Sequence, residues 1–245
     1  MNKRGISHIE MLLSFLIFAG FVIFALHFFS PFNASRLIES SLTYAKIEII
    51  KNTTIEIESY SISLDVSNSN DLNSVVQIEI EDYDASKEVQ AKNRNGDIVL
   101  AERVGSSNHI KFNTSNVYDT DPTKGFAIFR FGEGLIENPP PGGGGNNMIG
   151  TYTIISSEKE KFISESRIIN LKTAYEKNYE SVRNAFNLPS RANLEFEVAF
   201  STTEKISAQR PLRPQSEEMF VNSKRIEVLR NTGEIQFADL KVRVW

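Results

Sequence analysis

The feature that most constrains this chain is a long apolar run near its N-terminus, which extends from Met11 to Phe29. At about 1.5 Å per helical residue, such a run comes close to spanning the roughly 30 Å hydrocarbon core of a bilayer. The alternative is a buried core helix, but the rest of the chain is not apolar enough to surround one. Because Lys3 and Arg4 precede the run, we expect a single-pass membrane protein with a cytoplasmic N-terminus and an extracellular remainder.

Three kinds of N-terminal segment combine basic residues with an apolar run. A cleavable signal peptide needs a pair of small residues after the run, and the residues from Leu26 to Phe32 supply none. A simple signal anchor fits the run but explains nothing about Glu10, because a carboxylate at membrane depth costs up to about 3 kcal/mol. Glu10 therefore needs a partner that compensates its charge.

The third kind of segment accounts for that glutamate. A short basic leader ends at Gly5, and Glu10 is the fifth residue when Ile6 is counted as the first. This pattern resembles the processing signal of type IV pilins, and the short leader is more similar to archaeal pilins and archaellins than to bacterial pilins. The resemblance implies that a prepilin peptidase removes a leader of residues 1–5, cutting between Gly5 and Ile6.

The resemblance also implies an assembly role for Glu10. Cleavage creates a new α-amine at Ile6, and a buried carboxylate is tolerated when a cation pairs with it. We therefore expect Glu10 to pair with the Ile6 amine of a neighbouring subunit, with the apolar helices packed together as the core of a filament.

A second helical segment follows the apolar run. Pro31 lacks an amide donor, so it ends or kinks the first helix. Apolar residues then recur at spacings of four, three and four: Ile38, Leu42, Ala45 and Ile49. This is one helical face, and we predict a transmembrane helix over 6–31 and an amphipathic stalk helix over 32–50. Pilins have such a two-part first helix, so the resemblance implies the same arrangement.

Beyond residue 50 the periodicity changes from helical to the alternation of β-strands. From Thr54 on, apolar residues alternate with polar ones: Ile55, Ile57, Tyr60, Ile62, Leu64 and Val66. The phase shifts between Ile57 and Tyr60, which we interpret as a β-bulge. We expect residues 51–245 to form an extracellular, β-rich head.

Further strands and one helix are predicted in this head. The strands are expected at 74–82, 88–93, 97–104, 108–113, 125–131, 150–157, 192–200, 219–229 and 234–244. Asn95-Gly96 and Asn231-Thr232-Gly233 are typical of hairpin turns. An amphipathic helix is expected over 165–187, its tyrosines packing on the sheet rather than binding a ligand. The predicted fold class is α+β, with a long N-terminal helix, an antiparallel head and one packed helix.

Few residues of the sequence suggest a catalytic, metal-binding or cofactor-binding site. The chain has no cysteine, three histidines (His8, His27 and His109) and no hydrolase or metalloprotease motif, so we expect no catalytic site, metal or cofactor. The Pro/Gly stretch 138–147 indicates an exposed loop, because no Lys-Ser/Thr pair follows it as in a phosphate-binding loop.

Other candidate sites lie in polar loops. Acidic clusters at 79–84 and 119–121 lack the full spacing of a calcium loop, and we interpret them as solvated charge. Asn33, Asn52 and Asn113 each begin an N-glycosylation sequon, which matters for a head that faces outward.

The overall charge excludes one class of partner. With a formal net charge of −4, the chain has no electrostatic reason to bind nucleic acid. The expected partners are the membrane, a prepilin peptidase and other pilin subunits, and the expected function is that of a major or minor pilin. Two alternatives stay open: a membrane-anchored surface binding protein that does not polymerise, and a surface enzyme.

Overall fold

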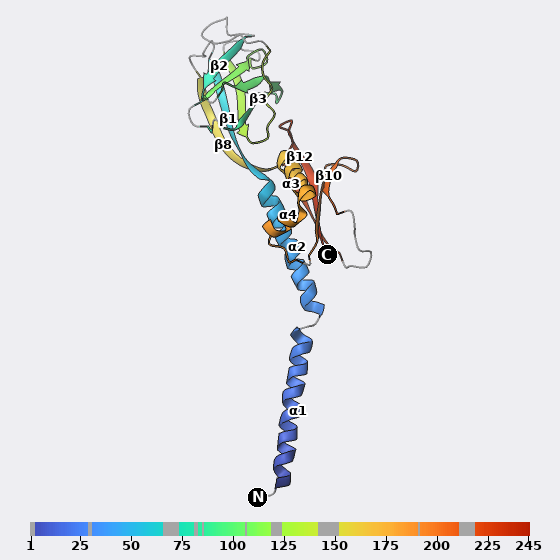
Figure 1. Cartoon of the computed structure of the whole chain (residues 1–245). Coiled ribbons are helices and arrows are strands. Elements are labelled where there is room, and N and C mark those ends of the chain that lie inside the picture. The colour runs from blue at the N-terminus through green and yellow to red at the C-terminus, as the bar shows by residue number, and fades with distance from the viewer. Residues whose placement is uncertain are drawn as a thin grey trace.

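The computed structural model describes residues 3–28, 31–65, 74–80, 83–84, 86–105, 107–118, 124–141, 152–190, 192–210 and 219–245. Of residues 3–8, 27–28 and 31–37 it describes the backbone alone. The chain is elongated, with helix α1 at one end, helix α2 next, and two β-rich lobes beyond them (Figure 1).

The two-part helix predicted from the sequence is confirmed. Helix α1 comprises Lys3–Phe28 and helix α2 comprises Pro31–Thr53. Pro31 is the first residue of α2, a position at which the missing N–H breaks no helical hydrogen bond. The helix extends three residues beyond the predicted end at residue 50, and the hydroxyl of Thr53 donates a hydrogen bond to the Ile49 carbonyl in its last turn (2.7 Å).

The head contains twelve strands within the described residues, in two sheets. Their bounds are β1 (Thr54–Asp65), β2 (Val75–Glu79), β3 (Glu88–Asn93), β4 (Ile98–Val99), β5 (Ala101–Arg103), β6 (His109–Asn113), β7 (Lys124–Gly132), β8 (Tyr152–Ser164), β9 (Leu194–Ala199), β10 (Lys205–Ala208), β11 (Phe220–Leu229) and β12 (Ile235–Val244). The larger sheet has the order β10-β9-β12-β11-β8-β1-β7-β3-β4, and the smaller one has the order β2-β6-β5. The strands pair antiparallel, as predicted, except that β8 and β11 pair in parallel through two residue pairs, which makes the larger sheet mixed.

The head has two hydrophobic cores. We call the part that surrounds α2 the proximal lobe: strands β9 to β12 carry α2, α3 (Glu165–Lys177) and α4 (Tyr179–Ala185). We call the part farther from α1 the distal lobe, which comprises β2 to β7 with the adjoining parts of β1 and β8. Strands β1 and β8 run from one lobe to the other (Figure 1), so the lobes share a continuous sheet.

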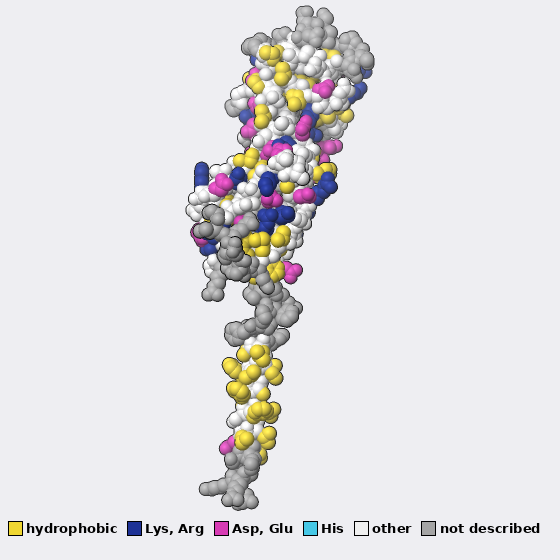
Figure 2. Space-filling view, turned by 90° about the vertical axis from the view of Figure 1, so that its right-hand side faces the viewer, with side chains coloured by type: hydrophobic (Ala, Val, Ile, Leu, Met, Phe, Trp, Pro, Cys, Tyr) yellow, Lys and Arg dark blue, Asp and Glu magenta, His cyan; other side chains and the backbone are white. Residues whose placement is uncertain are grey.

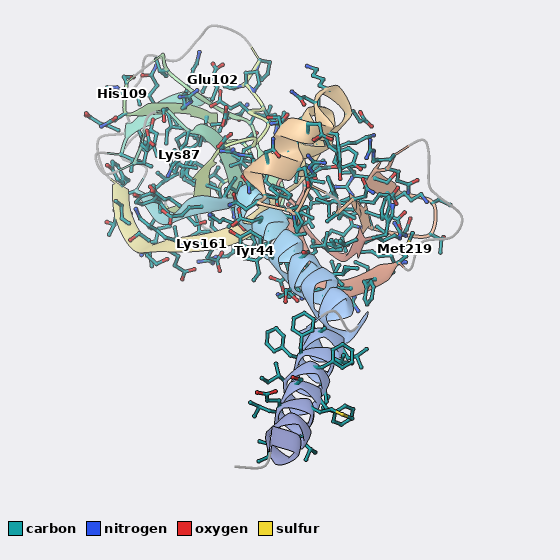
Figure 3. The ribbon with its side chains drawn as sticks, turned by 60° about the horizontal axis from the view of Figure 1, so that its bottom comes forward. Tyr44, Lys87, Glu102, His109, Lys161 and Met219 are labelled. Atoms are coloured by element: carbon teal, nitrogen blue, oxygen red, sulfur yellow. The ribbon has the colours of Figure 1, made fainter. Side chains whose placement is uncertain are left out.

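Aromatic side chains fill the distal core. Phe112 and Phe129 meet edge to face with ring centroids 5.2 Å apart, and Tyr83 stacks on Phe131 at 4.1 Å. Lys87 and His109 lie in this lobe and Met219 lies in the proximal lobe (Figure 3). The distal core is built without a helix among the described residues, because its two sheets cover each other.

The bulge predicted between Ile57 and Tyr60 in the first strand is wrong, because the strand pairs regularly there and the phase change has another cause. The pairing of β1 with β8 is regular from Thr54 to Ser61 and shifts between Ser61 and Ile62. The phase change arises because β1 buries opposite faces in its two halves. Ile57 packs in a small core between the lobes, whereas Tyr60 packs in the distal core.

The single helix predicted over 165–187 is two helices. Asn178 interrupts it with φ −151° and ψ 81°, and its side chain accepts a hydrogen bond from the Ser181 amide at the start of α4. The tyrosines on either side bind the backbone of β9: Tyr175 donates to the Leu194 carbonyl (2.6 Å) and Tyr179 accepts from the Leu194 amide (3.0 Å). They pack on the sheet, as predicted.

Several strand bounds also differ from the prediction. The strand expected at 97–104 is divided between β4 in the large sheet and β5 in the small one. β8 continues to Ser164 instead of ending at residue 157, and β10 was not predicted. β10 is a four-residue edge strand, too short for alternation to reveal it.

Candidate membrane-anchoring and assembly site

Helix α1 presents apolar side chains to its surroundings in every direction. The span Ile9–Leu26 has a mean hydropathy of 2.5, and none of its residues is buried against the rest of the chain. Figure 2 shows these apolar side chains along the described part of the helix, which projects from the head. A helix that is apolar all round requires lipid or other helices as its surroundings.

The length of this span suits a membrane. Its 18 residues extend about 27 Å at 1.5 Å per residue, close to the thickness of a bilayer core. Among the described residues it is the one helix long and apolar enough to cross a membrane. The structure therefore has one N-terminal apolar helix of the kind found in membrane spans and in signal sequences.

Glu10 is the one charged residue within the span Ile9–Leu26. Its side chain is exposed, and among the described residues it forms no hydrogen bond or ion pair. A lone carboxylate on an otherwise apolar surface has no stabilising partner within its own subunit.

Gly5 and Ile6, the predicted processing residues, lie in the first turns of α1. Ile6 precedes Glu10 by four residues, so both belong to the same face of the helix, one turn apart. A chain that began at Ile6 would carry its α-amine at the start of α1 and its acidic residue within the first turns.

Helix α2, which follows α1 in the chain, is packed firmly into the head. Leu42, Ala45 and Ile49 are buried in the proximal core, as predicted from their spacing. Lys46 donates a hydrogen bond to the side chain of Asn222 on β11 (3.2 Å), and strand β1 begins directly where α2 ends. Helix α2 therefore continues into the sheet without an intervening loop.

The three sequons lie in different settings. Asn33 belongs to α2, where the backbone alone is described. Asn52 is exposed near the end of α2 and donates to the Glu48 carbonyl (2.8 Å). Asn113 ends β6 and is half-buried, and its side-chain oxygen accepts a hydrogen bond (2.8 Å) from the amide of Ser115, the hydroxyl residue of this sequon.

The acidic clusters show no metal site among the described residues, where no group of three His, Cys, Asp or Glu side chains converges. The cluster at 119–121 and residues 81–82 of the other cluster lie outside the described part of the chain. Of the remainder, Glu79 lies 3.9 Å from His109 and Asp84 accepts bonds from Ser86. His8 and His27 belong to α1, where their side chains are not described.

A buried carboxylate that the sequence analysis missed lies where the two lobes meet. Glu58 is 5% exposed, and its Oε1 accepts from Lys87 (2.9 Å) and Lys159 (3.0 Å). Burial by itself raises the pKa of the Glu58 carboxyl, but the two lysines outweigh it and leave the pKa below its usual value. The phase shift in β1 could have revealed this residue, because it places Glu58 on the same buried face of the strand as Tyr60.

No family model, no curated protein and no solved structure matches this chain. The sequence and the structure together describe an N-terminal apolar helix followed by an α+β domain with a mixed sheet and packed helices.

Proposed function

We propose that this chain is a subunit, major or minor, of an archaeal type IV pilus-like surface filament. The observation that carries the proposal is Glu10, the one charge in an apolar, uncovered span, four residues after Ile6 and five after Gly5. The proposed partners are the membrane, a prepilin peptidase and further pilin subunits. Before assembly the head is extracellular and α1 crosses the membrane with its N-terminus in the cytoplasm.

The assembly step follows from the cost of an unpaired charge. In lipid, the Glu10 carboxylate of a single subunit is destabilising. When α1 helices pack together, the α-amine of Ile6 on a neighbouring subunit neutralises it, and the apolar side chains cover one another. The head, to which α2 is packed through Leu42, Ala45 and Ile49, then lies on the outside of the bundle.

The first experiment determines the N-terminus of the mature chain. Intact mass and N-terminal sequencing of protein extracted from its native membrane should give a chain that begins at Ile6. The Gly5→Leu variant should keep residues 1–5, because a side chain then obstructs the peptidase. A native chain that retains its first five residues contradicts the proposed processing.

The second experiment addresses Glu10 directly. The variants Glu10→Ala and Glu10→Gln should be processed and inserted normally but should be absent from sheared filaments, whereas Ser14→Ala, a change elsewhere on α1, should assemble. Immunoblots of the membrane and filament fractions measure both outcomes. Normal incorporation of Glu10→Ala shows that the pairing role is wrong.

The main alternative is a membrane-anchored binding protein that does not polymerise. A basic groove on the head, described below, is the observation that favours it. The fractions separate the two functions, because such a protein stays in the membrane fraction even when Glu10 is intact.

A further inference from the structure

The nine-stranded sheet is joined across the middle by a very short contact. Strands β8 and β11 pair through two residue pairs, Val228 with Ile163 and Leu229 with Ser164. By contrast, β11 pairs with β12 along its whole length, and β8 pairs with β1 from Ile163 to Tyr152. Although β11 lies in the middle of the strand order, the side of β11 that faces β8 is therefore unpaired over most of its length.

The groups exposed along this edge follow from the pairing with β12. The Arg230 amide donates a hydrogen bond to the Glu234 carbonyl. Counting back along β11 from this pair, every second residue exchanges hydrogen bonds with β12, and the residues between them do not. In an antiparallel ladder, residues of the non-bonded pairs direct their N–H and C=O groups to the opposite edge. On β11 these are Val221, Ser223 and Arg225, which pair with no described strand on that side, and the amide of Glu227, whose carbonyl faces the Ile163 amide of β8.

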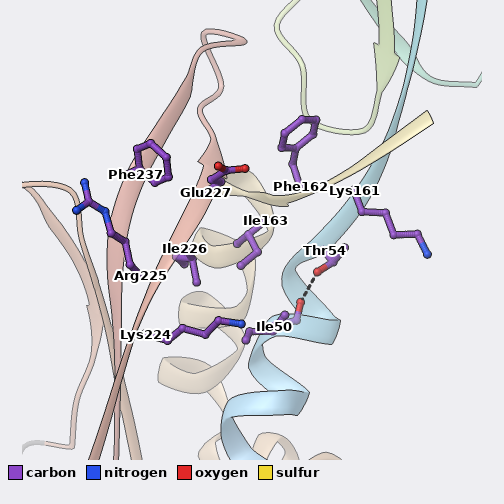
Figure 4. Close-up of a pocket in the computed structure, with 10 residues that line it drawn as sticks. All are labelled: Ile50, Thr54, Lys161, Phe162, Ile163, Lys224, Arg225, Ile226, Glu227 and Phe237. Carbon is purple, nitrogen blue, oxygen red and sulfur yellow. Dashed lines mark hydrogen bonds between the residues drawn. The ribbon is translucent and has the colours of Figure 1, made fainter. Parts of the chain in front are cut away.

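The edge borders a groove of about 500 Å³. Figure 4 shows Lys224–Glu227 of β11 on one side and Ile50 and Thr54 on the other. The segment Lys161–Ile163 of β8 closes the upper end, where the two strands meet, and Phe237 adds an aromatic ring. The groove thus offers both free backbone groups and side-chain contacts.

The charge of the groove is opposite to that of the chain as a whole. Lys161, Lys224 and Arg225 line it with one acid, Glu227, which leaves a formal charge of +2 (3 − 1), whereas the chain carries −4. None of the three cations forms an ion pair with a described residue; Arg225 lies over the Phe237 ring at 4.9 Å. All three are exposed and available to an anionic partner.

We propose that this groove binds an extended, acidic segment of a partner polypeptide. The segment adds a strand to the free edge of β11 through the backbone groups of Val221, Ser223 and Arg225 and the amide of Glu227. Its carboxylates lie beside Lys161, Lys224 and Arg225. Strand addition supplies the affinity through main-chain hydrogen bonds, and the cations select the charge. This site does not depend on the proposed role of Glu10, because it lies on the head.

The test uses the full chain in detergent and the fluorescein-labelled heptapeptide Thr-Glu-Glu-Thr-Glu-Glu-Thr, which presents carboxylates on both faces of an added strand, as the adjacent Lys224 and Arg225 require. Fluorescence anisotropy should show saturable binding that weakens as salt is raised. The same peptide with glutamine in place of glutamate should bind at least about fivefold more weakly, because each exposed charge pair contributes modestly. Equal binding of the two peptides overturns the proposed charge selection.

Variants separate the cations from the strand edge. Lys224→Gln combined with Arg225→Gln should weaken binding by about fivefold or more. Lys172→Gln with Lys177→Gln removes the same charge from α3 and should change nothing. Ser223→Pro removes an edge donor without breaking the β12 ladder and should abolish binding, whereas Ser223→Ala should retain it. Unchanged binding by folded Ser223→Pro overturns the proposal.

Hydrogen exchange provides a readout that needs no variant. In the free protein the amides of Val221, Ser223, Arg225 and Glu227 should exchange quickly, while those of Asn222, Lys224 and Ile226 are protected by β12. Saturating peptide should protect the first set. Slow exchange of that set without peptide means that the edge is already covered, and it overturns the proposal even if a variant fails to fold.

Discussion

The side-chain amide of Gln90 on β3 donates a hydrogen bond to the carbonyl oxygen of Thr232, 2.9 Å away, in the turn between β11 and β12. The two residues are 142 positions apart in the chain, and the bond joins the distal lobe to the proximal lobe. The next carbonyl, that of Gly233, accepts from Lys92 at 3.4 Å. The hairpin turn is therefore a clamp between the lobes, in addition to the continuous strands β1 and β8.

Gly233→Ala should loosen this clamp. Gly233 has φ +78°, and an added Cβ would lie 1.5 Å from Oε1 of Gln90, a side chain that is itself buried. We expect a loss of about 2–3 kcal/mol in the free energy of unfolding, measured with urea. Gly96→Ala is the matched control, since Gly96 has φ +88° with no atom near its added Cβ, and it should cost about 1 kcal/mol. Equal losses in the two variants contradict the clamp.

Glu58→Gln should destabilise the head by about 1–3 kcal/mol near neutral pH, because it removes the charge that two lysines share in a buried site. Glu56→Gln, an exposed neighbour on the same strand, should change stability by less than about 0.5 kcal/mol. Urea unfolding of both variants measures the difference.

The effect of Glu58 should depend on pH. Its pKa in the folded state lies below the usual 4.5, so the carboxylate stabilises the fold fully above that value. This contribution is lost as pH falls below 4.5 and through the folded pKa. The stability gap between the native chain and Glu58→Gln should therefore be largest near pH 7 and shrink in acid. A gap that widens below pH 4.5 contradicts this assignment.

Tyr175→Phe should cost about 1–2 kcal/mol, because the Leu194 carbonyl then loses its bond in a buried site. Tyr44→Phe removes the same hydroxyl from an exposed tyrosine on α2 and should be nearly neutral. Thermal or urea unfolding distinguishes them. If both changes are neutral, the bond between Tyr175 and Leu194 does not stabilise the attachment of α3 to the sheet.

An N-glycan added to the folded head is expected at Asn52 and not at Asn113. Asn113 is half-buried where β6 ends, whereas Asn52 is exposed and accessible to a glycosyltransferase. Glycopeptide mass spectrometry of protein from its native surface measures site occupancy. Asn52→Gln should remove carbohydrate mass and Asn113→Gln should not. A glycan found on Asn113 shows that modification precedes folding or that this turn opens.

Elements defined by neighbours in the sequence were predicted well. The spacing of Leu42, Ala45 and Ile49 identified the buried face of α2, and Pro31 marked the boundary between the helices. Strands β3, β6, β7, β11 and β12 lie where alternation predicted them. Helix and strand periodicities are local properties, so a few residues suffice to reveal them.

Contacts between distant residues were not predictable in the same way. Alternation in β1 showed a phase shift but could not show that its halves bury opposite faces in different lobes. Likewise, the helical spacing of apolar residues over 165–187 could not show that Asn178 divides this segment into two helices. The parallel contact of β8 with β11 joins residues 65 positions apart and carries no local signature.

The sequence alone therefore determined the apolar N-terminal helix with its single carboxylate, the helical stalk and the β-rich character of the rest. Each of these follows from residue type and from spacing over a few positions. The tertiary structure decided the two lobes, the clamp at Gly233, the buried Glu58 and the free edge of β11. These depend on which distant surfaces exclude water from one another, and that is settled by packing across the whole chain.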